Sequence, residues 1–145
     1  MTSRIFTQTI NVESGATMLT KLLPPKHLSK LDHIRVFSEP LLTLAIDGEL
    51  TGQDWRVLAV CLSEMQFENI LDISQSELAN LLQVKQQHIS QSMKKLIALG
   101  CLRIEDKRGK QNIYLVNPYL AFKSRSYNHK ALCEVWNSIE ESAYP

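Results

Sequence analysis

The stretch 73–117 constrains the fold most, because its apolar spacing is helical in two successive segments and then alternates. Ser74 is followed three residues later by Glu77, the spacing at which a Ser hydroxyl accepts from a free backbone N–H while the Glu carboxylate reaches back to the cap. Val84 falls in a short turn, where an apolar side chain holds a second helix against the first. The apolar face expected for the first helix consists of Leu78, Leu81 and Leu82.

A second helix is expected from about Gln86 to Leu99, ended by Gly100 in the left-handed conformation. Its buried face, at helical spacing, would be Ile89, Met93, Leu96 and Ile97. Its outward face would be polar and rich in amides: Gln86, Gln87, Ser90, Gln91, Lys94 and Lys95.

The chain after Gly100 alternates apolar and polar residues in two runs, which predicts two strands. Their connection, DKRGK, is small and strongly positive. Two helices joined by a short turn and followed by a basic hairpin are typical of a winged helix-turn-helix. In that fold the second helix enters a major groove and the hairpin grips the backbone beside it.

Positive charge is concentrated in one part of the chain, although the formal net charge is only +1. Residues 85–125 contain nine Lys or Arg and two Asp or Glu. Residues 1–84 contain six Lys or Arg and ten Asp or Glu. A run of charge is usually a solvated face, but this one coincides with the second helix and the hairpin. We therefore expect a surface for a polyanion, with the acidic remainder kept away from it.

We predict an α+β, mainly α chain in three parts. Residues 1–32 would form an N-terminal β-hairpin and linker, with strands near 4–12 and 16–22 around Glu13-Ser14-Gly15 and a stiff connector at Pro24-Pro25. Residues 33–125 would form the winged helix-turn-helix domain. Residues 126–145 would add a C-terminal helix.

Two helices and a strand are expected between the linker and Ser74. Ser38-Glu39-Pro40 opens a short helix, and Thr51 caps the next one with Asp54 at the favourable third position. A short strand at 70–73 would pair with the wing. The apolar face expected for the second of these helices consists of Trp55, Leu58, Ala59, Leu62 and Met65.

The C-terminal part offers two alternatives. Tyr119, Leu120 and Phe122 would fold back over the base of the wing. The last helix would then either pack on the same domain or form a homodimer contact through 128–142, since DNA-binding modules commonly pair to span two half-sites. Its apolar stripe consists of Ala131, Leu132, Val135, Trp136 and Ile139.

Several segments resemble the RepL-type plasmid replication proteins, a family of small winged-helix proteins. They are HIRVFSEPLLTLAI, the helix before Phe67-Glu68-Asn69-Ile70, the helix-turn-helix and YLVNPYLAFK. The resemblance covers roughly residues 33–125 and is most specific where the wing strand runs into Asn117-Pro118. It implies binding to a plasmid or phage replication origin and recruitment of host replication proteins.

The helix-turn-helix alone is similar to that of MarR-like regulators, so the alternative is a transcriptional repressor or activator at an operator. The sequence departs from the common pattern at Lys85, where such motifs usually carry Ser or Thr. A cation there opposes the helix dipole, unless a phosphate docks at the same helix end. Simple tolerance of Lys85 is the alternative to a phosphate contact.

The expected partner is double-stranded DNA. A Gln side chain can pair with the edge of adenine in one plane, although a Gln is also an ordinary residue on a solvent-facing helix. The candidates for base contacts are Gln86, Gln87, His88, Ser90 and Gln91. The candidates for phosphate contacts are Lys85, Lys94, Lys95, Arg103, Lys107, Arg108 and Lys110.

We expect no catalysis, cofactor or metal. The chain has no G-x-x-x-x-G-K-[ST] loop, and neither its histidines nor its cysteines show metal-ligand or nucleophile spacing. We expect a cytoplasmic protein, because neither a signal peptide nor a membrane-length apolar run is visible. The scattered residues are His27, His33, His88, His129, Cys61, Cys101 and Cys133, and the thiols should be free or buried.

Overall fold

The computed structural model describes residues 7–11, 18–22, 32–123 and 128–143. The chain divides into two units, Met1–His33 and Ile34–Pro145. In the first unit, β1 (Thr7–Asn11) pairs antiparallel with β2 (Met18–Leu22). The two predicted N-terminal strands are therefore confirmed, while the predicted turn at 13–15 and the connector at Pro24-Pro25 lie outside the described residues.

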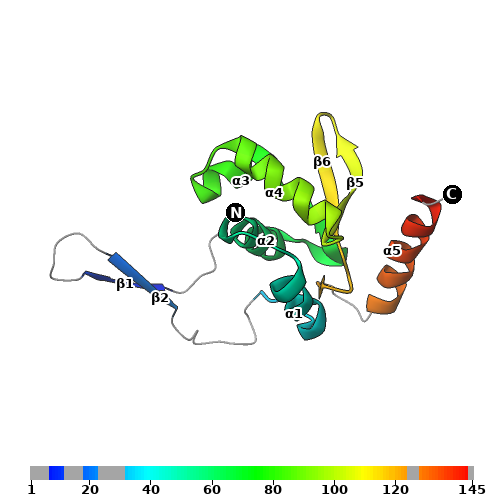
Figure 1. Cartoon of the computed structure of the whole chain (residues 1–145), viewed down its shortest axis with the longest axis horizontal. Coiled ribbons are helices and arrows are strands. Elements are labelled where there is room, and N and C mark those ends of the chain that lie inside the picture. The colour runs from blue at the N-terminus through cyan, green and yellow to red at the C-terminus, as the bar shows by residue number, and fades with distance from the viewer. Residues whose placement is uncertain (1–6, 12–17, 23–31, 124–127, 144–145) are drawn as a thin grey trace. The chain divides into compact units, whose positions relative to one another are not determined.

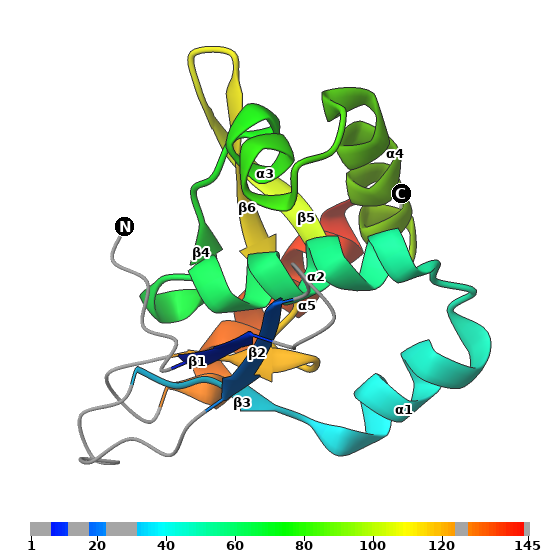
Figure 2. The same cartoon turned by 90° about the vertical axis from the view of Figure 1, so that its left-hand side faces the viewer.

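The second unit has the predicted order of helix, strand, helix, helix and hairpin (Figure 1). The three-stranded sheet has the order β4-β6-β5, and α2, α3 and α4 pack beside it (Figure 2). The elements are β3 (Arg35–Val36), α1 (Ser38–Asp47), α2 (Gly52–Glu64), the 3-10 turn η2 (Phe67–Asn69), β4 (Ile70–Leu71), α3 (Gln75–Leu82), α4 (Gln86–Ala98), β5 (Leu102–Arg108), β6 (Gln111–Val116), β7 (Ala121–Phe122) and α5 (His129–Ala143).

The predicted caps start α2 and α3. At α2, Thr51 accepts from the Asp54 backbone N–H, and the Asp54 carboxylate accepts from the Thr51 N–H. At α3, Ser74 accepts from the Glu77 N–H as predicted. Glu77 also reaches back to the cap as predicted, where its carboxylate accepts from the Ser74 hydroxyl at 3.2 Å.

The buried face of α2 is rotated from the predicted one. Val57, Leu58, Cys61 and Met65 are buried, whereas Ala59 is exposed and Trp55 and Leu62 are only partly buried. The reason is Asp54, which is itself buried and bonded to α4. Residues three, four, seven and eleven positions after an inward residue lie on the same side of a helix, so Asp54 selects this face.

Two apolar residues expected in the core are exposed instead. Leu81 is 51% exposed on α3, and Ile104 is 47% exposed on the wing. A register shift between Ile104 and Asp106 interrupts the β5–β6 pairing there. Gly100 and Gly109 take positive φ at the end of α4 and at the wing tip, where a side chain would be strained.

The base of the wing is closed by a two-residue strand pair that the sequence did not predict. β7 pairs antiparallel with β3, placing Arg35 opposite Phe122. Leu120 and Phe122 are buried as expected, but Tyr119 is 47% exposed. Strands this short show no alternation, so hydrophobic spacing could not reveal them.

The C-terminal helix α5 contacts the same domain. Trp136 and Cys133 are buried, whereas Ala131 and Val135 of the predicted apolar stripe are exposed. These contacts support the packing alternative for the buried side of α5. None of the described helices combines the length and the apolar character that a membrane span requires.

Asn69 is the buried polar residue that joins the helical part to the base of the wing. Its amide donates to the carbonyls of Val116 (3.0 Å) and Ala121 (2.8 Å), and its side-chain oxygen accepts from the Lys123 N–H (2.9 Å). Asn69 is fully buried and has a φ of 62°, a conformation that Asn tolerates better than most residues.

We expect Asn69→Ala to lower the free energy of unfolding by about 3 kcal/mol, because it leaves buried carbonyls without their donor. Urea denaturation would measure the loss. Asn80→Ala, at an exposed α3 position, is the matched control and should change stability by less than about 0.5 kcal/mol. Equal effects of the two substitutions would show that the buried amide does not stabilise the fold.

Candidate nucleic-acid interface

The polar face of α4 is open to solvent. Its opposite face is fixed in the core by Ile89, Met93 and Leu96, so the helix cannot turn its polar side inward. Ser90 is half-buried at the edge of the exposed face. The exposed polar residues at the start and along this face are Lys85, Gln86, Gln87, His88, Gln91 and Lys94.

The tip of the wing carries three exposed cations. Lys107, Arg108 and Lys110 surround Gly109 at the hairpin tip and are exposed. The wing tip and the start of α4 lie at the same end of the domain, the upper edge in Figure 2. An amide-rich helix therefore begins at the end of the domain where the cationic loop lies.

Asp54 fixes α4 against α2 through a buried network. Its carboxylate accepts from the Ser92 hydroxyl at 2.7 Å and lies 3.0 Å from the Lys95 ammonium. Lys95 also donates to the Glu49 carbonyl. Lys95, for which the sequence predicted a phosphate contact, is therefore already paired with a carboxylate in this structure, and its side chain is 35% exposed.

The pKa of Asp54 is lowered from 3.8 to about 2. Burial raises this pKa, but the hydrogen bond from Ser92, the Thr51 backbone N–H and the Lys95 ammonium together outweigh burial. The ionised carboxylate thus stabilises the position of α4 throughout the neutral range.

Arg103 also lies in a different place from the one predicted. Its guanidinium is 4.0 Å from the centre of the Trp136 ring, and it donates to the Trp136 carbonyl at 2.9 Å. Its side chain is only 14% exposed, and Glu105 lies 4.0 Å away. Arg103 therefore anchors α5 to the wing strand and is not part of the exposed basic surface.

Lys85 occupies the N-cap position of α4, as predicted. Its backbone is extended, and its side chain makes no capping hydrogen bond. No acidic residue is present in the first turn of α4. The start of this helix therefore combines unbonded backbone N–H groups with an exposed ammonium group.

Asp72 is a residue of this surface that the sequence did not identify. It follows β4, and its carboxylate lies 2.9 Å from Arg108 and accepts from Gln111 at 2.6 Å. Both partners belong to the wing tip and are more than 35 residues away in the chain. No local spacing could predict the contact, because it depends on how β4 pairs with β6.

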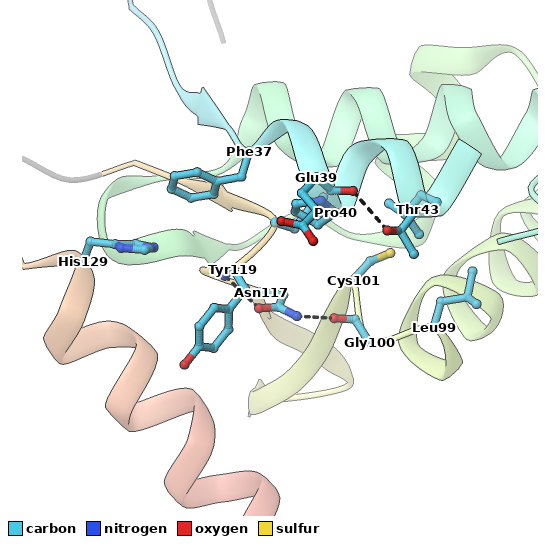
Figure 3. Close-up of a pocket in the computed structure, with 12 residues that line it drawn as sticks. Phe37, Glu39, Pro40, Thr43, Leu99, Gly100, Cys101, Asn117, Tyr119 and His129 are labelled. Atoms are coloured by element: carbon cyan, nitrogen blue, oxygen red, sulfur yellow. Dashed lines mark hydrogen bonds between the residues drawn. The ribbon is translucent and has the colours of Figure 1, made fainter. Parts of the chain in front are cut away.

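A pocket of about 570 Å³ lies between α1, the base of the wing and the start of α5 (Figure 3). Several of its polar groups are bonded within the protein: Thr43 donates to the Glu39 backbone carbonyl, Asn117 donates to the Gly100 carbonyl, and His129 lies close to the Pro118 carbonyl. The Tyr119 hydroxyl accepts from Asn137. The pocket therefore offers no convergent set of unbonded polar side chains that would indicate chemistry.

The three cysteines are free and buried, which the sequence predicted. Burial raises the pKa of Cys61 to about 12 and that of Cys101 to about 11, so neither thiol forms the nucleophilic thiolate at neutral pH. In the part of the chain that the structure describes, no three His, Cys, Asp or Glu residues are grouped to hold a metal ion.

Helices α2 to α4 with the β5–β6 wing form a winged helix-turn-helix domain. No protein family model matches the chain, and no curated protein is detectably similar to it. The resemblance to the RepL-type replication proteins is thus not confirmed.

Three solved structures are similar in part. A protein of the archaeon Sulfolobus tokodaii is 21% identical with a TM-score of 0.40, over 66% of this chain and 86% of that one. The adhesin competence repressor of Streptococcus pyogenes is 12% identical with a TM-score of 0.39, over 71% and 66%. A MarR family regulator of Neisseria meningitidis is 14% identical with a TM-score of 0.37, over 72% and 68%.

We expect Asp54→Asn to destabilise the protein by about 2 kcal/mol at neutral pH, because a carboxylate with a lowered pKa favours the folded state. This contribution is complete above about pH 4 and is lost as the pH falls toward 2. Urea denaturation of wild type and variant across this range would measure it. A difference in stability that stays constant down to pH 2 would contradict the assignment.

Proposed function

We propose that this chain binds double-stranded DNA, with α4 in the major groove and the wing on the adjacent backbone. The single observation that carries the proposal is that the exposed, amide-rich face of α4 belongs to a helix whose start lies at the same end of the domain as the cationic wing tip (Figure 2). Residues 85–125 are rich in Lys and Arg, whereas residues 1–84 have an excess of acidic residues. That distribution would orient the domain on a polyanion.

The exposed positions divide into two roles. The amide, hydroxyl and imidazole groups of α4 would contact base edges, where Gln can pair with adenine: Gln86, Gln87, His88, Ser90 and Gln91. The cations would contact phosphates, which supply affinity without sequence preference: Lys85, Lys94, Lys107, Arg108 and Lys110.

Two substitutions separate these roles. Gln87→Ala should weaken binding to the selected sequence by about 1–3 kcal/mol and leave random-sequence binding nearly unchanged. Lys107→Ala should weaken both and reduce the slope of log affinity against log salt by about one. Fluorescence anisotropy at several salt concentrations would measure both effects. Loss of the same affinity on both duplexes in Gln87→Ala would argue against base contact.

Lys85→Ser should stabilise the free protein by about 1 kcal/mol, because Ser caps the helix and removes a cation from its positive end. If Lys85 contacts a phosphate, the same variant should also lower the salt slope by about one. Urea denaturation and anisotropy provide the two measurements. An unchanged slope in a more stable protein would mean that Lys85 is only tolerated at the cap.

We place regulation of transcription at an operator first. A regulator needs little more than a DNA-binding surface, which the exposed face of α4 and the wing tip would supply. Binding at a replication origin is the second candidate, because YLVNPYLAFK and the segments before it resemble the RepL-type proteins. Initiation would in addition need a surface for host replication proteins, and the described residues identify no such surface.

Selecting bound duplexes from a random pool would define the target. An inverted repeat in the selected sites would support a homodimer, for which the exposed side of α5 within 128–142 is our candidate contact. The selected site, placed in a promoter and separately in a plasmid lacking other replicons, would then separate the roles. Repression without plasmid maintenance supports the regulator, and maintenance supports the origin-binding protein.

A further inference from the structure

The outer half of the wing is exposed to solvent. On β5 every residue from Ile104 to Arg108 is exposed, and on β6 full burial begins only at Tyr114. Apolar burial, the main source of rigid packing, is therefore small at the tip. Polar contacts must contribute to the direction in which the tip points.

One carboxylate contacts both strands at that tip. Asp72 lies 2.9 Å from Arg108 through one oxygen and accepts from Gln111 at 2.6 Å through the other. Arg108 and Gln111 are partners across the turn formed by Gly109 and Lys110. Because Asp72 lies two residues before the cap of α3, it ties the wing tip to the start of the helix-turn-helix.

The two contacts differ in their exposure to water. The Asp72 side chain is 19% exposed, while the Arg108 side chain is 72% exposed. The hydrogen bond to Gln111 is partly buried. An ion pair as open as that of Arg108 contributes little to stability, so a competing anion can replace it easily. A phosphate presents oxygens to the guanidinium much as a carboxylate does.

We propose that Asp72 is a positioning residue that holds the wing tip and occupies the Arg108 guanidinium until a DNA phosphate replaces it. The proposal rests on the DNA-binding function argued above. Gln111 keeps its hydrogen bond to Asp72 during the exchange, so the tip stays in place while Arg108 changes partner. The exchange weakens phosphate binding on every sequence, which gives the base contacts of α4 a larger share of the total affinity.

The substitution Asp72→Asn tests the exchange, because an Asn oxygen can still accept from Gln111 but does not pair with Arg108 as an ion. We expect Asp72→Asn to bind a short random-sequence duplex about fivefold more tightly at low salt, with the gain shrinking as salt rises. Asp47→Asn, at an exposed position at the end of α1, is the matched control and should have a much smaller effect. Anisotropy titrations would measure both.

The same comparison in an Arg108→Gln background identifies the exchange itself. If DNA breaks the ion pair, Asp72→Asn increases DNA affinity more in the protein that has Arg108 than in the Arg108→Gln background. The reason is that DNA binding removes an ionic partner from Asp72 only when Arg108 is present. If the ion pair persists in the complex, the increase in DNA affinity caused by Asp72→Asn is smaller in the protein that has Arg108. The guanidinium then neutralises the charge of Asp72, so that removing this charge changes less. The second result would overturn the proposal.

The remaining outcomes separate this inference from the proposed function. If no variant binds any duplex, both are wrong. If wild type binds DNA but Asp72→Asn behaves like Asp47→Asn, only the exchange is wrong. If circular dichroism shows that Asp72→Asn does not fold, the salt dependence of DNA binding by Arg108→Gln tests the proposal instead. A salt slope lower by about one supports the phosphate contact of Arg108, and an unchanged slope overturns it.

Discussion

The Asp54 carboxylate is the constraint on which the position of the candidate interface depends. It caps α2 through the Thr51 N–H and bonds to Ser92 and Lys95 on α4. This one carboxylate therefore starts α2, selects the buried face of α2 and fixes the rotation of α4. The cost of burying a charge is offset here because several donors surround it. The polar face of α4 points outward as a direct consequence.

The domain uses polar contacts wherever apolar packing ends. Asn69 satisfies the carbonyls at the base of the wing, and Asp72 holds the wing tip. These two residues lie on either side of β4, whose pairing with β6 brings both to the wing. The strand β4 is only two residues long, but the residues on either side of it attach the wing to the helical part of the domain.

Cationic side chains that stabilise the fold are less exposed than the cationic side chains proposed to contact DNA. Lys95 and Arg103 are drawn into the protein, the first to Asp54 and the second to Trp136. Both are about a third exposed or less, whereas Arg108 is 72% exposed. Net charge along the sequence therefore overstates the basic surface. The cations that remain outside are concentrated at the wing and along the outer face of α4.

The sequence by itself determined the helices, their caps and the wing, because these follow from local spacing: Thr51 with Asp54, Ser74 with Glu77, and Gly100 before the alternating strands. It also predicted correctly that Gln86, Gln87, Gln91 and Lys94 of α4 are exposed. Three features follow from the packing of distant segments: the pairing of Lys95 and Arg103 within the protein, the direction of the buried face of α2, and the contact of Asp72 with the wing tip. Those outcomes depend on contacts between residues distant in the chain, and hydrophobic period carries no information about such pairs.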